Sequence, residues 1–428
     1  MNEHELPGEE LSAGEIAAPI LPEKPRFSAS WQEIAAALAC YVLGWIWFDL
    51  EQPGWLLIFV AAFIGLTELL HRETPRPWES WVWLGCMLVL TASVVFDRYN
   101  AWEEAFFPLF FLHIFAVWWA LSRSGRLSEG VSGHLLPLDA LNAFIILPFK
   151  HFFLRVRSLW YGLTHLGRGE KRVKTETVVW SAAAVLVAVL LFAKAVQLLM
   201  KADAGFGALL KDFANWFSFD FDGIRLLFSL PVGAYVFGLL AGAAREDADV
   251  LRERGSRLKT WLATLRRVPA PVFAVLMAAF ALLYLAFFIL QAHYLFGAFT
   301  RTLPEGFVVA EYARQGFFEL CRVMAVNFAL LWLTARLPER PLQEQTLLRA
   351  LAAVLLGESL LFAVIAASKL GLYIDCFGFT PLRLQSFWLV CVLAAGCVCA
   401  LTTLFTGKRS FRAWMFFGAA TLSLLCLV

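Results

Sequence analysis

Residues 303–322 read LPEGFVVAEYARQGFFELCR, and they lead directly into the apolar sequence VMAVNFALLWLTA of residues 323–335. The first stretch carries ionisable side chains at the entrance of an apolar helix; they are Glu305, Glu311, Arg314, Glu319 and Arg322. Ionisable groups are costly in a bilayer, so they usually face a protein interior or a wet cavity. The apolar run predicts a membrane span, and the charges at its entrance predict a functional site.

The composition extends this prediction to the whole chain. Hydrophobic residues make up 60% of the 428 residues and charged residues only 16%, whereas an average soluble domain is about 25% charged. The net charge of +2 argues against a nucleic-acid partner. The eight cysteines form no C-x-x-C pair, so neither a disulfide framework nor a metal site is predicted. No cofactor is predicted either.

Apolar segments long enough to cross a bilayer recur along the chain, since a spanning helix needs about 20 apolar residues. They predict eleven spans in an all-α, polytopic membrane bundle: 31–48, 54–70, 78–96, 105–121, 177–200, 224–243, 271–296, 317–335, 347–368, 384–405 and 411–428. The second and fourth are short, and the fourth contains Pro108. These two are full spans or a re-entrant pair.

The distribution of Lys and Arg predicts the orientation. Most basic residues lie in the loops after the even-numbered spans, above all in residues 123–174 and 245–267. Because cytoplasmic loops carry the excess of Lys and Arg, the N-terminus is predicted inside and the C-terminus outside. Residues 303–322 then lie at the outer face.

The same pattern divides the chain into four parts. Residues 1–30 are predicted to be a disordered cytoplasmic tail, because they are acidic and polar. Residues 31–122 form a four-helix membrane part, residues 123–176 a basic cytoplasmic or interfacial segment, and residues 177–428 a seven-helix membrane domain.

Two basic segments are predicted to lie outside the spans. Residues 139–166 place aromatic and basic side chains at helical spacing, which is typical of a helix lying on the bilayer and held by anionic lipids of the inner leaflet. A sensor of anionic lipid or a docking helix is the alternative. Residues 244–267 predict a charged helix or hairpin that packs on the protein or docks a partner.

Two polar sets are predicted to meet at the outer face. Glu311, Glu319 and Arg322 share one helix face by their spacing, with Arg314 beside them. Lys369, Tyr373 and Arg383 belong to the predicted loop between spans nine and ten, on the same side of the membrane. Together they predict a pocket for an anionic ligand. The alternative is an ion-paired network that fixes helix packing, in which Lys369 and Arg383 neutralise Glu311 and Glu319.

Three more polar residues fall inside predicted spans. Glu358 is a candidate proton carrier or ion ligand, or else a protonated carboxyl hydrogen-bonded between helices. Lys194 is a possible partner of Glu358. His113 is single and not at metal-ligand spacing, so a packing role is predicted for it.

Three sequence segments carry a family resemblance. They are YLFG at residues 294–297, VAEYARQGFFEL at residues 309–320 and LYIDCFGFTPLR at residues 372–383. In these segments the chain resembles a family of bacterial polytopic membrane proteins known as a domain of unknown function. Val309 stands where that family usually has Tyr, and Lys369 where it has Arg. The resemblance implies a bacterial inner-membrane protein and supplies no catalytic residue.

Two functions remain open from the sequence. The first is binding or transport of a small or lipidic anionic ligand from the outer face. The second is a structural or signalling role in which the basic inner loops dock another protein. An enzyme is the least supported class, because no nucleophile or metal constellation is present in the sequence.

Overall fold

The computed structural model describes residues 27–97, 102–165, 223–292 and 309–427, and the regular elements within these ranges are helices. The first half contains α1 (Trp31–Ile46), η1 (Trp47–Asp49), α2 (Pro53–Leu70), α3 (Glu79–Asp97), α4 (Trp102–Ser124), α5 (Leu136–Leu141), η2 (Asn142–Ile146), α6 (Leu147–Lys150), α7 (Leu154–His165) and α10 (Gly223–Arg245). The second half contains α11 (Ala248–Thr264), α12 (Ala270–Leu290), α14 (Val309–Arg336), η3 (Leu342–Glu344), α15 (Thr346–Phe377), α16 (Pro381–Thr406) and α17 (Phe411–Leu425).

Local sequence signals explain where several helices begin and end. The Ser30 hydroxyl accepts a hydrogen bond from the Glu33 amide at 3.2 Å and caps α1. Pro381 occupies the first turn of α16, where its missing amide hydrogen is not needed. Gly378 ends α15 with φ +76° and ψ 177°, a conformation that is essentially restricted to glycine.

Nine helices in the described ranges are long and apolar enough to span a membrane, which makes the fold that of a multi-pass membrane protein. They coincide with nine of the eleven predicted spans. The predicted span at residues 177–200 lies outside the described residues, and α17, with 15 residues, is shorter than a full span. The eleven-span count therefore stays a prediction. Helix α2 has 18 residues, and the apolar part of α4 has 20.

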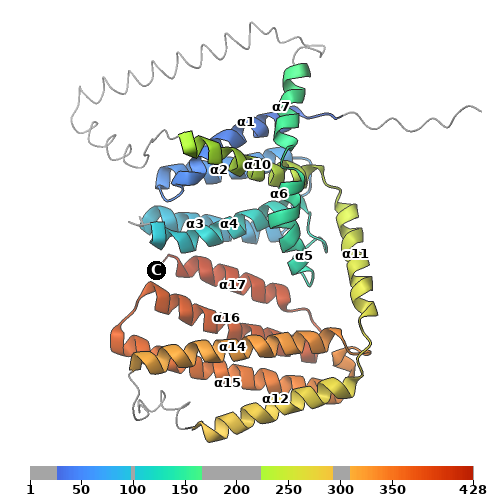
Figure 1. Ribbon diagram of the computed structural model, residues 1–428, viewed down its shortest axis with the longest axis vertical. Coiled ribbons are helices and arrows are strands. Elements are labelled where there is room, and N and C mark those ends of the chain that lie inside the picture. Colours follow the sequence, from blue (N-terminus) through green and yellow to red (C-terminus); the bar gives the residue numbers. More distant parts are fainter. Residues whose placement is uncertain (1–26, 98–101, 166–222, 293–308, 428) are drawn as a thin grey trace, which may run out of the picture.

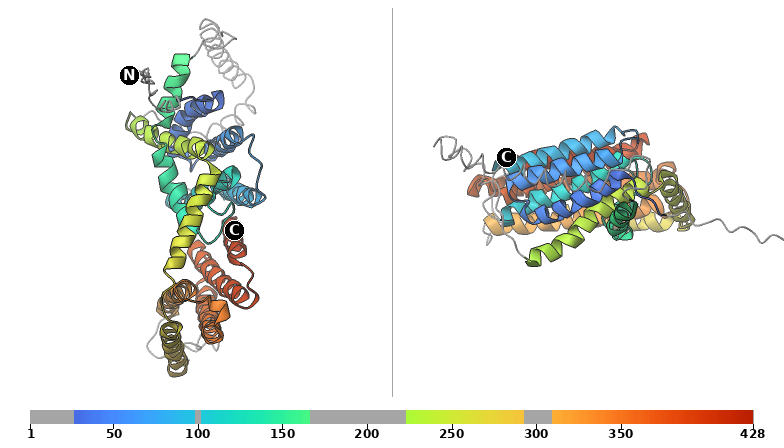
Figure 2. Two further views of the ribbon diagram at one scale, coloured as in Figure 1. Left: turned by 90° about the vertical axis from the view of Figure 1, so that its right-hand side faces the viewer. Right: turned by 90° about the horizontal axis from the view of Figure 1, so that it is seen from above.

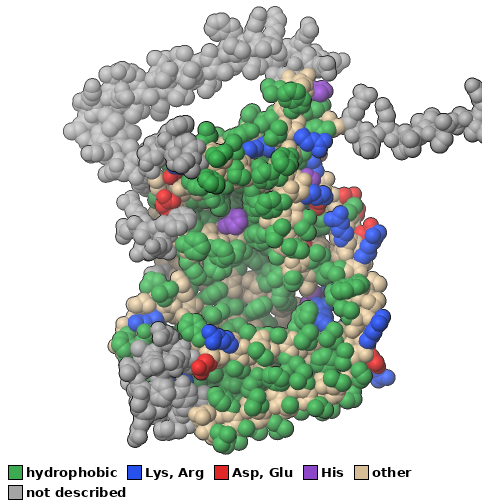
Figure 3. Space-filling view, viewed as in Figure 1, with side chains coloured by type: hydrophobic (Ala, Val, Ile, Leu, Met, Phe, Trp, Pro, Cys, Tyr) green, Lys and Arg blue, Asp and Glu red, His purple; other side chains and the backbone are tan. Residues whose placement is uncertain are grey.

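The spans run side by side and stack into an elongated molecule (Figures 1 and 2). Helices α5, α6, α7 and α11 run across this direction on one side of the stack (Figure 1). Lys and Arg side chains gather on that side (Figure 3). We call it the basic end; it comprises α11 and the last turns of α2, α4, α10, α14 and α16.

The two segments predicted outside the spans are both helical, but one is broken. Within residues 139–166 the chain forms α5, the π-helical η2, α6 and α7, with a bend of 41° between Leu136–Lys150 and Leu154–His165. Residues 244–267 contain the single helix α11, so the hairpin alternative was wrong. Helix α11 connects the first-half helices to α12 (Figure 1).

In the described part of the chain, buried apolar side chains form two clusters. The first joins α1, α2, α3, α4 and α10, and it also takes in Ala419 and Leu422 of α17. The second joins α12, α14, α15 and α16. Helix α17 also contacts α16, because the Trp414 indole donates to the Val392 carbonyl at 2.7 Å. Helix α10 therefore packs with the N-terminal helices, and α17 connects the two clusters.

Candidate functional site

Lys369 is the residue around which the predicted outer-face site is built. The sequence placed it, together with Tyr373 and Arg383, in a loop after span nine. This was wrong, because α15 continues as one helix to Phe377 and Arg383 lies in the first turn of α16. The Lys369 side chain is 0% exposed and lies beside the apolar cluster of α12, α14, α15 and α16. Glu319 of α14 is within electrostatic reach of the Lys369 ammonium. Two residues from the two predicted polar sets are thus brought together.

The other predicted residues of α14 lie toward its surface or outside the described side chains. Glu319 and Arg322 are exposed. Helix α14 includes Glu311 and Arg314, but their side chains lie outside the described residues.

Tyr373 and Arg383 form a contact at the end of α15. The Arg383 guanidinium lies 4.3 Å from the centroid of the Tyr373 ring, a distance suited to a cation–π interaction. Its Nη1 donates to the Phe377 carbonyl at 2.7 Å and also bonds the Gly378 carbonyl. These carbonyls are left without helical partners where α15 ends, so Arg383 caps this helix about two turns beyond the buried Lys369.

A chain of hydrogen-bonded polar side chains crosses the second cluster, farther from the end of α15 than Lys369 is. The Tyr284 hydroxyl of α12 donates to Asn327 Oδ1 of α14 at 2.8 Å, and Asn327 Nδ2 donates to Ser359 Oγ of α15 at 2.9 Å. Asn327 and Ser359 are each 1% exposed. The chain satisfies polar groups that would otherwise be costly among apolar side chains.

Glu358 adjoins this chain and points into the protein. Its Oε2 is buried and has no hydrogen-bond partner among the described residues, and its charge acts on Tyr284. Eleven residues separate Glu358 from Lys369, which on an α-helix is about three turns, or about 16 Å, along nearly the same face. Helix α15 therefore presents a carboxyl and an ammonium group on one side.

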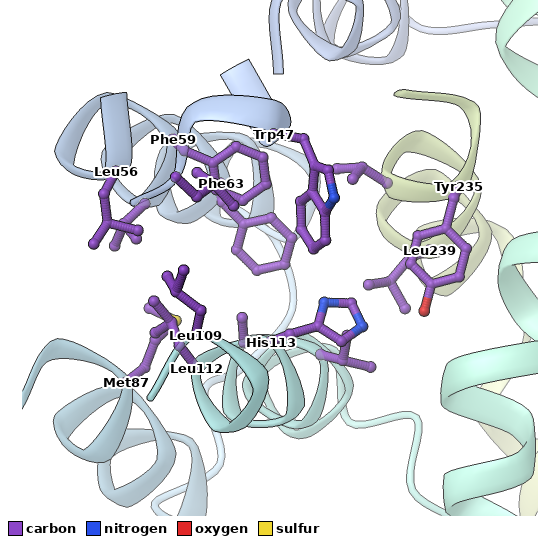
Figure 4. Close-up of a pocket in the computed structure, with 15 residues that line it drawn as sticks. Trp47, Leu56, Phe59, Phe63, Met87, Leu109, Leu112, His113, Tyr235 and Leu239 are labelled. Carbon is purple, nitrogen blue, oxygen red and sulfur yellow. The ribbon is translucent and has the colours of Figure 1, made fainter. Parts of the chain in front are cut away.

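His113 lies among aromatic rings, as its predicted packing role requires. Its ring centroid is 5.5 Å from that of Trp47, 5.9 Å from Phe144 and 6.1 Å from Tyr235. Figure 4 shows the His113 ring below those of Trp47 and Tyr235, among the side chains that line a small apolar cavity. The space left there for water-sized molecules is about 40 Å³, too small for an organic ligand. Lys194 lies outside the described residues.

The sequence did not reveal a second group of buried charges at the basic end. The Arg123 guanidinium donates to Glu68 at 3.0 Å, to the His71 carbonyl at 2.9 Å and to the Thr74 carbonyl at 3.1 Å. This ties the end of α4 to the turn after α2. The basic residue at the end of an apolar run was the available signal, but its partners are far away in sequence.

Glu79 ties α3 to neighbouring segments, as Arg123 ties α4 to the turn after α2. Its carboxylate is 0% exposed and accepts from the Trp83 indole at 3.0 Å and from the Ser132 amide at 3.0 Å. Arg412 of α17 lies 4.0 Å from the same carboxylate and donates to the Ser132 carbonyl at 3.2 Å. These contacts hold α3, the loop after α4 and α17 together, which is a structural role.

Among the described residues no three His, Cys, Asp or Glu side chains are grouped as metal ligands. Polar groups in or beside the second cluster include one ammonium, two carboxyls, a phenol, an amide and a hydroxyl: Lys369, Glu319, Glu358, Tyr284, Asn327 and Ser359. Such a set can hold an anion beside the ammonium and exchange a proton at the carboxyls.

Comparison with known proteins supports the sequence resemblance. The model of one family, described as a domain of unknown function (DUF4153), matches residues 35–428. No curated protein and no solved structure matches the chain. Because the family model covers nearly all of the described helices, the chain belongs to the DUF4153 family.

Proposed function

We propose that this protein binds or moves a small or lipidic anionic ligand from the outer face of a bacterial inner membrane. The observation that carries the proposal is the fully buried ammonium of Lys369 near the end of α15 farthest from the basic end. A lysine at this depth is expensive, and an anionic ligand would recover part of that cost.

Glu319 and Arg383 have supporting roles in this proposal. The Glu319 carboxylate balances the Lys369 charge while the site is empty, and an arriving anion competes with it for the ammonium. Arg383 and Tyr373 fix the end of α15, so that the Lys369 backbone keeps its position. Arg322 lies on α14 three residues after Glu319 and supplies a second, exposed cation.

Glu358 extends the proposal to proton coupling. Its Oε2 has no partner among the described residues and is buried beside Tyr284. A carboxyl in this position can bind a proton or a small cation as the charge at Lys369 changes, because the two groups share one face of α15.

The test is ligand-dependent thermal stabilisation of the purified full chain. The probes are inorganic phosphate, sulfate, acetate and phosphatidylglycerol, each compared with a neutral counterpart. At least one anion is expected to raise the melting temperature of the wild type. Lys369→Gln should weaken that anion's affinity about ten- to a hundredfold, since a hydrogen bond to a charged group contributes about 1.5–3 kcal/mol.

Lys408→Gln is the matched control, because Lys408 is an exposed cation at the basic end. It should leave the affinity unchanged. If Lys369→Gln binds the same anions as tightly as the wild type, the proposed ligand site is wrong.

One specific observation favours the alternative function, in which the basic inner loops dock another protein. Helix α11 is amphipathic and basic, and its Trp261 side chain is 57% exposed. Exposed tryptophan beside arginine is typical of protein interfaces. Cross-linking in cells from photoreactive residues placed at Trp261 and at Arg254 should yield one discrete partner band; its absence at both positions would remove this candidate.

A further inference from the structure

Arg155 is a buried cation that neither proposed function uses. It is the second residue of α7, just after the bend that follows α6, and its side chain is 4% exposed. Its guanidinium lies 3.9 Å from the centroid of the Tyr41 ring of α1. Its Nη2 donates to the Leu230 carbonyl of α10 at 3.0 Å. Arg155 is therefore inserted where α7 crosses α1 and α10.

Most of the hydrogen-bonding capacity of Arg155 is unused. Its Nε and Nη1 are buried without a hydrogen-bond partner among the described residues. The ionisable groups that act on it are Tyr41 and Cys40, and neither is a carboxylate. A buried guanidinium without a carboxylate partner is strongly unfavourable for folding. An anion bound at this position would therefore stabilise the protein.

The adjacent sequence does not supply that anion. Residues 140–169 contain no Asp or Glu. The carboxylate of Glu246 is already bonded to Lys150 of α6. The neighbouring cation Arg157 is exposed and stacks on Phe27. The region around α6 and α7 thus carries an excess of positive charge.

An open apolar groove of about 400 Å³ adjoins Arg155. Its walls come from the bend, from the start of α7 and from the first half of α10; they include Phe152, Phe153, Val156, Leu227, Phe228 and Pro231. These side chains offer no polar partner for a soluble anion, but they match a hydrocarbon chain.

We infer that the junction of α7 and α10 is a binding site for an anionic phospholipid, with the phosphate on Arg155 and one acyl chain in the groove. Arginine suits this role because its planar guanidinium donates to two phosphate oxygens at once. One Nη2 hydrogen is donated to the Leu230 carbonyl, and the other completes such a pair of donors with the free Nε or the free Nη1. The lipid occupies a gap in the protein surface, and this distinguishes it from lipid attracted by the basic end in general.

The test is native mass spectrometry of the delipidated full chain with added phosphatidylglycerol or phosphatidylcholine of the same acyl chains. The wild type should bind phosphatidylglycerol in preference. Arg155→Gln should weaken that binding about tenfold. Arg157→Gln removes the same charge two residues away from an exposed position, and it should change the affinity less than twofold.

A second variant keeps the test decisive if Arg155→Gln does not fold. Val156→Trp retains Arg155 but fills the groove from its exposed wall, and it should also lower phosphatidylglycerol binding about tenfold. The inference is overturned if the wild type binds both lipids equally, or if Arg157→Gln weakens binding as much as Arg155→Gln. It is equally overturned if Val156→Trp binds phosphatidylglycerol as the wild type does.

Discussion

The buried charged side chains of this protein differ in how fully they are bonded. Arg123 and Glu79 each make several hydrogen bonds that join separate segments at the basic end. Glu358 and Arg155, in contrast, keep buried polar atoms without a partner among the described residues. A bonded charge serves packing, whereas a buried charge with spare donors or acceptors is best explained by a ligand or proton.

His71 provides a pH-dependent test of the basic end. Burial, and then the charges of Arg123 and Arg126, lower the pKa of His71 to about 4. The folded protein therefore holds this imidazole neutral between pH 4 and about 6.5, while the unfolded chain protonates it. The contribution of the neutral His71 to the free energy of unfolding is complete above pH 6.5. It is lost as the pH drops toward 4, and the loss is about 3 kcal/mol at most.

The expected result is that His71→Gln flattens this part of the stability profile. Unfolding in detergent would be followed at several pH values between 4 and 7 for both proteins. Above pH 7 the variant should differ little from the wild type. Parallel profiles for the two proteins would show that His71 does not titrate in this way.

At the scale of elements, the crossing of α1 and α10 depends on two glycines. A Cβ atom on Gly44 would lie 2.2 Å from the Ser229 carbonyl oxygen, and one on Gly233 would lie 2.2 Å from the Cys40 carbonyl oxygen. Both distances are shorter than any normal contact. The absence of side chains lets the two helix backbones approach closely, as small residues do at membrane helix interfaces.

Gly44→Ala should accordingly destabilise the protein by about 1–3 kcal/mol, because the helices must separate to admit the methyl group. Gly357→Ala is the matched control: Gly357 is also helical, and a Cβ there meets nothing within 4 Å. The control should be neutral or slightly stabilising. Equal melting temperatures for the two variants would contradict the close crossing.

The elements also show what the sequence could and could not predict. Long apolar runs made nine spans predictable, because hydropathy depends on local composition. The end of α15 was missed, since the backbone stays helical beyond the point where the apolar run ends at Lys369. The bend at residues 151–153 was missed too, because it depends on contacts of α6 and α7 with α10, including the Arg155 bond to Leu230.

At the candidate site the sequence predicted the residue types but few of their contacts. The proximity of Glu319 and Lys369 follows from antiparallel spans, and it was expected. The hydrogen bonds from Tyr284 to Asn327 and from Asn327 to Ser359 were not expected, because hydroxyl and amide residues in apolar helices carry no sequence signal for their partners. Likewise, the Arg123 contacts join positions about fifty residues apart and depend on tertiary packing.

At the scale of the whole molecule, the described helices build two apolar clusters, and α11, α16 and α17 connect them. Helix α17 contributes Ala419 and Leu422 to the first cluster, and its Arg412 bonds the loop after α4. The Trp414 indole of α17 donates a hydrogen bond to α16, which belongs to the second cluster. The proposed ligand site therefore lies in a bundle that is attached to the first half through the short α17, the crosswise α11 (Figure 1) and α16, whose Trp388 ring lies 6.5 Å from that of Phe111.

The orientation of the molecule in the membrane can be tested directly. The excess of Lys and Arg at the basic end predicts that this end faces the cytoplasm. Alkaline phosphatase fused after Arg267 should be inactive, and the same enzyme fused after Gly378 should be active. Fusions to green fluorescent protein at the two positions should show the opposite pattern. The reverse result would place Lys369 on the cytoplasmic side.

The most direct test of the ligand site is the charge movement that accompanies anion binding in reconstituted membranes. Proteoliposomes adsorbed on a solid-supported membrane would be exposed to steps of phosphate, sulfate and acetate. The account predicts a transient current with the wild type and Lys408→Gln, and its loss with Lys369→Gln. A current of the same size and concentration dependence in Lys369→Gln would contradict the claim that the buried ammonium is the anion-binding group.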